Sequence, residues 1–319
     1  MRILLVKTSS LGDVVHNLPV ASDLARRFPG AIIDWVVEEA FADIPRLHPA
    51  VRHVIPVALR RWRKHPGTVT TWREVVAFRR QLHALSYDLV LDTQGLLKSA
   101  LLVGQARLGL RGRRVGYDRH SAREPLAACF YDISFPVDRR LHAVERNRQL
   151  AARAGGYNPD ALNYGIHSPT PPAVAPAIPY AVLLTATSRA DKEWPEPAWL
   201  ELAAGLRERG YVCVLPAGSA SERERAERLA QSVTGGIAAP PLGLTDLAGL
   251  LGGAGLVVGV DTGLTHLAAA LGKPTIALFC GSSPELTGVH AGPVAINLGG
   301  SHQPPAPDEV LAAVATLLS

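Results

Sequence analysis

The residues of this sequence best suited to chemistry lie in a turn between an apolar run and an amphipathic run. In residues 256–272, LVVGVDTGLTHLAAALG, a buried strand pattern ends at Asp261-Thr262-Gly263 and a helix pattern follows. A helix beginning there turns backbone N–H groups outward with the positive end of its dipole behind them, which suits a phosphate or diphosphate. The alternative is that Asp261 or Thr262 only caps the helix. The turn alone leaves both interpretations open.

A second candidate is Lys192, in the loop TATSRADKEWP (185–195) that follows another strand pattern. The carboxy-terminal half of the chain has only one other lysine, Lys273, and uses arginine for the rest of its positive charge. As a compact point charge, Lys192 could neutralise a diphosphate leaving group, with the hydroxyls of Thr187 and Ser188 as donors. The alternative is a lysine that faces solvent, and the binding role is the favoured interpretation.

Two loops of the amino-terminal half also follow strand patterns. KTSSLGD (7–13) contains neither the G-x-G-x-x-G of a dinucleotide site nor the Walker A lysine pattern, which argues against NAD binding and ATP hydrolysis. Its Asp13 could accept a proton from a substrate hydroxyl as a general base, or could cap a helix. DTQGLLK (92–98) sets Lys98 one turn into a predicted helix, where it adds positive charge near the same opening or faces solvent.

Two further side chains are weaker candidates for ligand contacts. Glu222 closes the loop PAGSASE (216–222), where a carboxylate could hold a ribose diol or could belong to any first helical turn. Ser219 or Ser221 is a candidate cap of the same helix. His266, in the segment LTHLAAAL, fits a ligand contact and a packed core residue equally well.

The elements that must position these residues alternate between strand and helix patterns. In the carboxy-terminal half the strand patterns are 180–185, 211–216, 256–260 and 275–279, and the helix patterns are 199–208, 222–231, 244–251 and 264–271. The amino-terminal half alternates through 2–7, 22–28, 32–37, 53–57, 72–85, 87–92 and a helix from 97. Such alternation predicts right-handed parallel βαβ units. The predicted fold is therefore α/β, with two Rossmann-like doubly wound domains, 1–165 and 166–306.

A proline-rich stretch, 158–179, separates the two halves and has little periodic structure. Such a density of proline predicts a semi-rigid linker. We therefore expect a cleft between the domains. Because ligands of open parallel sheets bind beyond the carboxyl ends of the strands, the loops after the strands should line that cleft.

Composition limits the class of protein. At 319 residues, 47% of them apolar, the chain is long enough for two cores. No apolar run reaches the roughly 18 residues of a membrane span. The amino-terminal segment MRILLVK is too short for a secretory signal, so a cytoplasmic location is expected. The cysteines at 129, 213 and 280 are far apart in apolar stretches, which predicts buried reduced thiols.

The charge of the chain is asymmetric. Residues 1–165 hold 25 Lys+Arg against 15 Asp+Glu, a balance of +10, whereas residues 166–319 hold 8 against 13, a balance of −5. A basic half fits a polyanionic substrate or an anionic membrane, and no recognisable nucleic-acid motif is present. The run RRWRK (60–64) concentrates this charge, and its Trp62 could lie at a membrane interface; the alternative is a solvated face.

Motifs along nearly the whole chain resemble one enzyme family. They are VKTSSLGDVVHNLP, DWVVEEAFADIP, VIPVALRRWRK, DTQGLLKSALL, AREPLA, HAVERNR, DKEWPEPAWLEL and VDTGLTHLAAAL. Together they are similar to the ADP-heptose:lipopolysaccharide heptosyltransferases, which have the glycosyltransferase-B fold. The resemblance implies an acceptor-binding domain, 1–165, a donor-binding domain, 166–306, and a carboxy-terminal helix, 307–319, that packs back on the first domain.

The resemblance implies transfer of L-glycero-D-manno-heptose from ADP-heptose to the first Kdo of Kdo2-lipid A, with inversion and with no metal or other cofactor; the sequence contains no Asp-x-Asp pair. Asp13 is then the catalytic base. The implied donor-binding residues are Thr187, Ser188, Lys192, Glu222, Leu242, Asp261, Thr262, Gly263, Leu264 and His266. The implied acceptor-binding residues are Ser10, Arg60, Arg61, Arg63, Lys64 and Lys98. The partners are ADP-heptose, Kdo2-lipid A and, peripherally, the cytoplasmic face of the inner membrane.

Two residues depart from the family pattern. Ala217 stands where a tryptophan is frequent, and Leu242 stands where a methionine often lies by the adenine. Three alternatives stay open: a heptosyltransferase that adds the second heptose, a non-catalytic nucleotide-sugar-binding protein, and a nucleotide-sugar epimerase. The run RRWRK and the stretch AREP favour the first-heptose enzyme.

Overall fold

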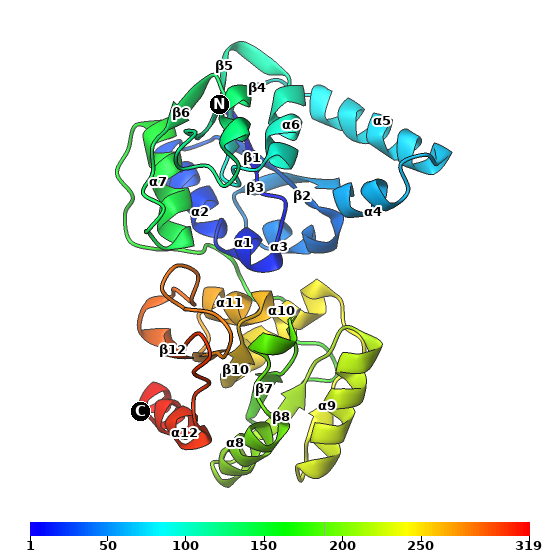
Figure 1. Cartoon of the computed structure of the whole chain (residues 1–319), viewed down its shortest axis with the longest axis vertical. Coiled ribbons are helices and arrows are strands. Elements are labelled where there is room, and N and C mark those ends of the chain that lie inside the picture. The colour runs from blue at the N-terminus through cyan, green and yellow to red at the C-terminus, as the bar shows by residue number, and fades with distance from the viewer. Residues whose placement is uncertain (188) are drawn as a thin grey trace. The chain divides into compact units, whose positions relative to one another are not determined.

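The computed structural model describes residues 1–187 and 189–319, which form two α/β units (Figure 1). The first unit is Met1–Ile166 and the second is His167–Ser319. The division falls one residue after the predicted boundary. It lies inside the proline-rich stretch 158–179, which the structure describes throughout and which contains no helix or strand.

The first unit contains a six-stranded sheet in the order β3-β2-β1-β4-β5-β6, and all of its pairings are parallel. Its strands are β1 (Arg2–Val6), β2 (Ile32–Glu38), β3 (Val51–Val57), β4 (Tyr87–Asp92), β5 (Leu108–Tyr117) and β6 (Ile133–Phe135). Its helices are α1 (Leu11–Val15), α2 (Leu18–Arg27), α3 (Asp43–Arg46), α4 (Leu59–Lys64), α5 (Val69–His83), α6 (Leu97–Gln105) and α7 (Ala143–Gly155), with short 3-10 helices η1 (Glu39–Phe41) and η2 (Pro125–Phe130).

The second unit contains another six-stranded parallel sheet, in the order β12-β11-β10-β7-β8-β9. Its strands are β7 (Tyr180–Leu184), β8 (Val212–Leu215), β9 (Ile237–Ala238), β10 (Leu256–Val260), β11 (Thr275–Phe279) and β12 (Ala295–Gly299). Its helices are α8 (Glu196–Glu208), α9 (Ala220–Ser232), α10 (Leu244–Gly253), α11 (Gly263–Ala270) and α12 (Pro307–Leu318), with η3 (Ala190–Lys192) and η4 (Gly292–Val294).

The two sheets share one topology. Numbered from the first strand of its own unit, each has the order 3-2-1-4-5-6 of doubly wound folds, which confirms the predicted α/β architecture. The strand order reverses between β1 and β4 in the first unit and between β7 and β10 in the second. Ligands of such sheets bind at this reversal, beyond the carboxyl ends of the strands. A ligand site is therefore expected in the loops that follow these four strands.

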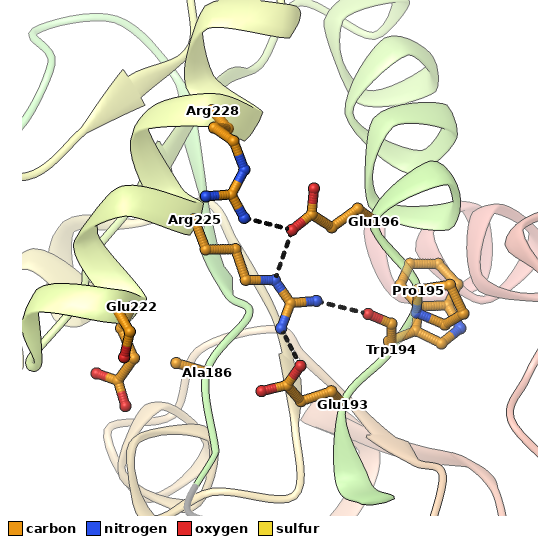
Figure 2. A pocket seen from close by; sticks show the side chains of 9 residues that line it. Ala186, Glu193, Trp194, Pro195, Glu196, Glu222, Arg225 and Arg228 are labelled. Atoms are coloured by element: carbon orange, nitrogen blue, oxygen red, sulfur yellow. Dashed lines mark hydrogen bonds and ion pairs between the residues drawn. The ribbon is translucent and has the colours of Figure 1, made fainter. Parts of the chain in front are cut away.

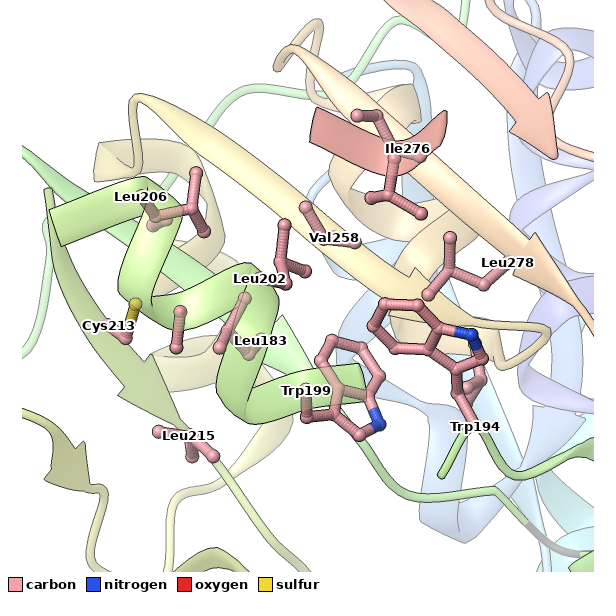
Figure 3. Packing of buried hydrophobic residues seen from close by; sticks show 14 of the residues in the cluster. Leu183, Trp194, Trp199, Leu202, Leu206, Cys213, Leu215, Val258, Ile276 and Leu278 are labelled. Atoms are coloured by element: carbon pink, nitrogen blue, oxygen red, sulfur yellow. The ribbon is translucent and has the colours of Figure 1, made fainter. Parts of the chain in front are cut away.

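Tryptophans and aliphatic side chains fill the core of the second unit (Figure 3). Trp194 and Trp199 pack edge to face, with ring centroids 5.0 Å apart. Helix α12 packs on α8, where a side chain at Gly205 would come within 2.7 Å of Leu311. A side chain at Gly205 would force the end of Leu311 to shift, and Val310, Ala313 and Val314 of α12 are buried in the same core, so the terminal helix completes the core of its own unit. The expectation that it also reaches the first domain stays a prediction.

The prediction of buried thiols is correct for two of the three cysteines. Cys213 and Cys280 are buried, and burial raises the pKa of their thiols to about 12 and about 11. The prediction is wrong for Cys129, which is exposed in η2, where Ala127 is the residue that is buried. Among the residues described, no helix is both long enough and apolar enough to cross a membrane.

Candidate functional site

The turn after β10 forms the first wall of a site in the second unit. All five residues of β10 are buried, and the chain passes through Asp261 and Thr262 directly into α11. Thr262 is the N-cap residue, yet no side chain described in the structure makes a capping hydrogen bond there. The backbone N–H groups of Gly263 and Leu264, at the first turn, can therefore donate hydrogen bonds to a ligand. The structure favours the anion-binding interpretation of this turn over the capping one.

The carboxylate of Asp261 is the centre of a polar cluster. Its Oδ2 accepts hydrogen bonds from Lys192 Nζ at 2.5 Å and from Ser282 Oγ at 2.7 Å, and its Oδ1 lies 3.7 Å from His266 Nε2. Burial acts to raise the pKa of Asp261, but the interactions with His266, Lys192 and Ser282 outweigh it and hold the pKa well below the usual range. The carboxylate is therefore ionised at every physiological pH.

The loop that carries Lys192 is held close to the end of β11. A side chain at Gly281 would come within 2.5 Å of the carbonyl oxygen of Asp191, so only glycine lets η3 lie this near the strand. Thr187 joins the same wall, since its Oγ1 donates to the backbone oxygen of Asp261 at 3.2 Å. Ser188, a predicted donor-binding residue, lies outside the described residues.

Arg225 of α9 fixes the far end of this loop (Figure 2). Its Nη1 lies 2.6 Å from Glu193 Oε2, its Nη2 donates to the backbone oxygen of Trp194 at 2.8 Å, and its Nε lies 3.5 Å from Glu196 Oε1. One buried guanidinium therefore holds the residues that follow Lys192. Arg225 is not predictable from the sequence, because nothing in a charged helix marks which arginine turns inward.

Glu222 lies one turn before Arg225 on α9 and lines a cavity of about 440 Å³ (Figure 2). Its Oε2 accepts the amides of Gly218 and Ser219, both at 2.9 Å, and its own amide donates to Ser219 Oγ. The capping interpretation of Glu222 is thus realised, and the residue also lines the cavity. The cavity is lined by Ala186, Glu193, Trp194, Pro195, Glu196, Ser221, Glu222, Arg225 and Arg228.

The two positions that depart from the family pattern both lie in this unit. Ala217, after β8, packs against the core of the unit. Leu242 is half-buried in the loop before α10. Both side chains are small or aliphatic, so the surface at these positions is apolar.

Asp13 occupies the corresponding place in the first unit, after β1. It is half-buried at the third position of α1, and its Oδ2 accepts from the amide and the hydroxyl of Ser10 at 2.8 and 3.0 Å. Its Oδ1 has no hydrogen-bond partner among residues 1–187 and 189–319. Asp13 therefore does cap α1, and one of its oxygens remains available to accept a proton.

Two lysines surround Asp13. Lys98, from the loop after β4, donates to Ser9 Oγ at 2.7 Å, and burial lowers its pKa while the charges of Glu38 and Asp13 act in the opposite direction. Lys7 is buried, donates to the backbone oxygen of Thr93 at 2.9 Å, and has a pKa lowered first of all by burial. Lys7 was missed as a site residue although it opens the KTSSLGD loop, because nothing local distinguishes a buried lysine from a solvated one.

The residues of the basic run RRWRK (60–64), on α4, differ in their contacts and burial. Arg61 pairs with Glu39 at 2.9 Å and with Glu74 at 2.8 Å, so its charge is already neutralised. Trp62 donates to Glu74 Oε2 and packs edge to face on Phe78, which places it against the core of the unit and not at an exposed membrane interface.

The remaining cations of α4 are exposed. Arg60 stacks on the ring of Phe41, with the guanidinium carbon 5.3 Å from the ring centroid. Arg63 and Lys64 extend into solvent. Arg60 and Arg63 both influence the pKa of Lys98, so these cations belong to the surroundings of Asp13. The interdomain cleft that would bring this group to face Lys192 stays a prediction.

Where the structure describes the chain, no group of three or more His, Cys, Asp or Glu side chains is arranged to hold a metal ion. The polar groups of the second unit fit an anion instead: a lysine beside the first amides of a helix.

Comparison with known proteins agrees with this geometry. The model of glycosyltransferase family 9 (heptosyltransferase) matches residues 75–311. Lipopolysaccharide heptosyltransferase 1 of Pseudomonas aeruginosa is 50% identical over 295 residues, which cover 91% of this chain and 81% of that protein. Lipopolysaccharide heptosyltransferase 2 of Escherichia coli K12 is 26% identical, over 90% of this chain and 85% of that protein.

Two solved structures are similar over their whole length. Those of E. coli heptosyltransferase WaaC with ADP and with ADP-2-deoxy-2-fluoro heptose cover 100% of this chain and 99% of theirs. Their TM-scores are 0.89 and 0.84, and their sequence identities are 42% and 40%.

Proposed function

The chain belongs to glycosyltransferase family 9, the heptosyltransferases, and from this premise we propose that it transfers L-glycero-D-manno-heptose from ADP-heptose to the first Kdo of Kdo2-lipid A. It is a glycosyltransferase, and its predicted glycosyltransferase-B fold is confirmed. The observation that carries the choice of acceptor is the much higher identity to heptosyltransferase 1 than to heptosyltransferase 2. The alternative of adding the second heptose is not favoured.

The second unit would bind the donor. The ammonium of Lys192 and the first amides of α11 would hold the diphosphate. The hydroxyl of Thr187 would join them by turning from the backbone oxygen of Asp261 to a phosphate oxygen. Glu222 would hold the ribose and Asp261 would contact the heptose. Because negative charge builds on the diphosphate as the anomeric bond breaks, donors fixed in advance by the fold stabilise the transition state more than the bound substrate.

The first unit would bind the acceptor and supply the base. The acceptor hydroxyl oxygen attacks the anomeric carbon, the bond from that carbon to the phosphate oxygen breaks, and Oδ1 of Asp13 takes the hydroxyl proton while ADP departs. Attack from the face opposite the leaving group inverts the anomeric centre. An oxocarbenium-like transition state gains from a nearby carboxylate, a role suited to Asp261.

We propose that the reaction needs no metal ion, because Lys192 and the helix amides supply the positive charge that a metal would otherwise provide. Arg60, Arg63, Lys64 and Lys98 would pair with the phosphates and carboxylates of the acceptor, with Ser10 beside them. The same charges would let the protein act peripherally at the cytoplasmic face of the inner membrane.

The test is transfer of labelled heptose from ADP-heptose to purified Kdo2-lipid A, with and without a chelator. Equal transfer in both arms is expected. Activity only on heptosyl-Kdo2-lipid A would assign the second-heptose reaction, whereas donor binding without transfer would indicate a binding protein. Release of a modified sugar in the absence of acceptor would indicate an epimerase, and loss of activity with the chelator would refute metal independence.

A further inference from the structure

Helix α5 turns its apolar residues in two opposite directions. Thr71, Phe78 and Leu82 are buried against the first unit. Val69, Trp72 and Val76, however, are 67%, 62% and 44% exposed. At about 100° per residue, positions 69, 72 and 76 form one stripe on the side of the helix opposite the core. An exposed tryptophan flanked by two valines in register is an apolar surface that the described part of the chain leaves largely uncovered.

Arginines border the stripe. Arg73, Arg79 and Arg80 are exposed on the same side of α5, and the last two line a shallow hollow of about 410 Å³ together with Val76, His83 and Ala84. The single acid of the helix, Glu74, is turned away and is bound by Arg61 and Trp62. The α5 face, defined as the stripe and its three arginines, therefore carries positive charge that no carboxylate of its own helix offsets.

This combination identifies the occupant. Apolar side chains with an indole among them favour the boundary between headgroups and acyl chains, and arginines beside them pair with lipid phosphates. A second copy of the chain would set arginine against arginine across a two-fold axis, which like charges oppose. In Figure 1, α4 and α5 extend outward from the sheet of the first unit. Since the residues of the α5 face are also exposed, a lipid surface can contact them directly.

We propose that α5 lies in the headgroup region of an anionic lipid surface, with Val69, Trp72 and Val76 inserted and Arg73, Arg79 and Arg80 on the phosphates. The proposal deepens the membrane contact put forward above, on which it rests, by adding a second element, α5, to the exposed cations of α4. It also separates lipid docking by α5 from acceptor recognition by the cations around Asp13.

The experiment measures binding of the full chain to vesicles of phosphatidylcholine alone and of phosphatidylcholine with phosphatidylglycerol, with neither substrate present. Wild type should sediment with the anionic vesicles only. The double variant Trp72→Asp/Val76→Asp should bind at least on the order of tenfold more weakly. Arg79→Ser and Arg80→Ser should each weaken binding roughly fivefold. The matched control is Leu110→Asp, because Leu110 is a fully exposed apolar residue on β5, away from α5. This variant should bind the vesicles as wild type does.

Three outcomes would overturn the proposal: no binding of wild type to anionic vesicles, equal binding by the double variant, or an equal loss in Leu110→Asp. A concentration-dependent dimer that Trp72→Asp/Val76→Asp dissociates would assign the face to a second copy instead. Circular dichroism and the single variant Trp72→Ser guard against unfolding. Transfer to Kdo2-lipid A without vesicle binding defeats only this inference, whereas vesicle binding without transfer defeats only the proposed reaction.

Discussion

The ammonium of Lys192 lies 2.5 Å from Oδ2 of Asp261, so two residues 69 positions apart in the chain form an ion pair beside the first turn of α11. The pair fixes a positive charge at a terminus whose helix dipole already favours anions. It also means that Lys192 is not a solvated loop lysine. Its carboxylate partner stays ionised, since the pKa of Asp261 is held low by Lys192, His266 and Ser282 against the effect of burial.

We expect Lys192→Ala to weaken donor binding and slow transfer together, by on the order of 10²–10³ in kcat/KM, because the lost charge stabilises departing ADP. Isothermal titration with ADP and steady-state kinetics measure the two effects. Lys273→Ala is the matched control, since Lys273 is the only other lysine of this half of the chain. Wild-type kinetics for Lys192→Ala would show that the ion pair has no part in catalysis.

Asp13→Asn separates the two roles of Asp13. The amide oxygen of asparagine can still accept from the Ser10 amide, so the cap of α1 and the melting temperature should change little. An amide cannot take the acceptor proton, so transfer should fall by on the order of 10²–10⁴ while ADP-heptose binding stays as in wild type. Asp43→Asn, at an exposed pair with Arg46, is the control. Full activity of Asp13→Asn would leave Asp13 as a cap alone.

Arg225→Lys tests whether the position of the Lys192 loop matters. Lysine keeps the charge but cannot bind Glu193 and the Trp194 carbonyl at once with a planar fork. We expect a higher KM for ADP-heptose, an unchanged KM for the acceptor and roughly tenfold slower transfer. Arg207→Lys is the control, because Arg207 is exposed on α8 and lies outside the cavity lining. If Arg225→Lys melts at a lower temperature but has wild-type kinetics at temperatures where it is fully folded, the role of Arg225 is structural only.

The Asp261 cluster also predicts a pH dependence of stability. A carboxyl group whose pKa falls on folding stabilises the folded state above its unfolded pKa, here near 3.8, and loses that contribution as the pH falls toward the lower folded value. Thermal unfolding between pH 7 and pH 2 should therefore show a steeper loss below about pH 5 in wild type than in Asp261→Asn. Parallel curves for the two proteins would contradict the cluster as described.

The sequence by itself determined the elements that carry the site. Buried strand patterns ending in polar and glycine-containing loops located Asp13, Lys98, Lys192 and Asp261, because strand periodicity and turn chemistry are encoded within a few residues. It did not predict β5, β6, β9, β12 or α7. In β5 arginines interrupt the apolar pattern at a partly exposed position near the sheet edge, so the strand shows no clear local period. In α7 the buried face includes the polar residues Asn147 and Arg148, so apolar residues alone do not mark it.

The tertiary structure alone decided which loops meet. The parallel order β1-β4 and β7-β10 brings together loops that are some 70 to 85 residues apart, and no local pattern records that order. Only the folded chain shows that Arg61 is already paired, that Lys7 is buried and that Arg225 holds the Lys192 loop. Charge and burial at these positions depend on neighbours distant in sequence, because Coulombic and desolvation energies are set by distances in space.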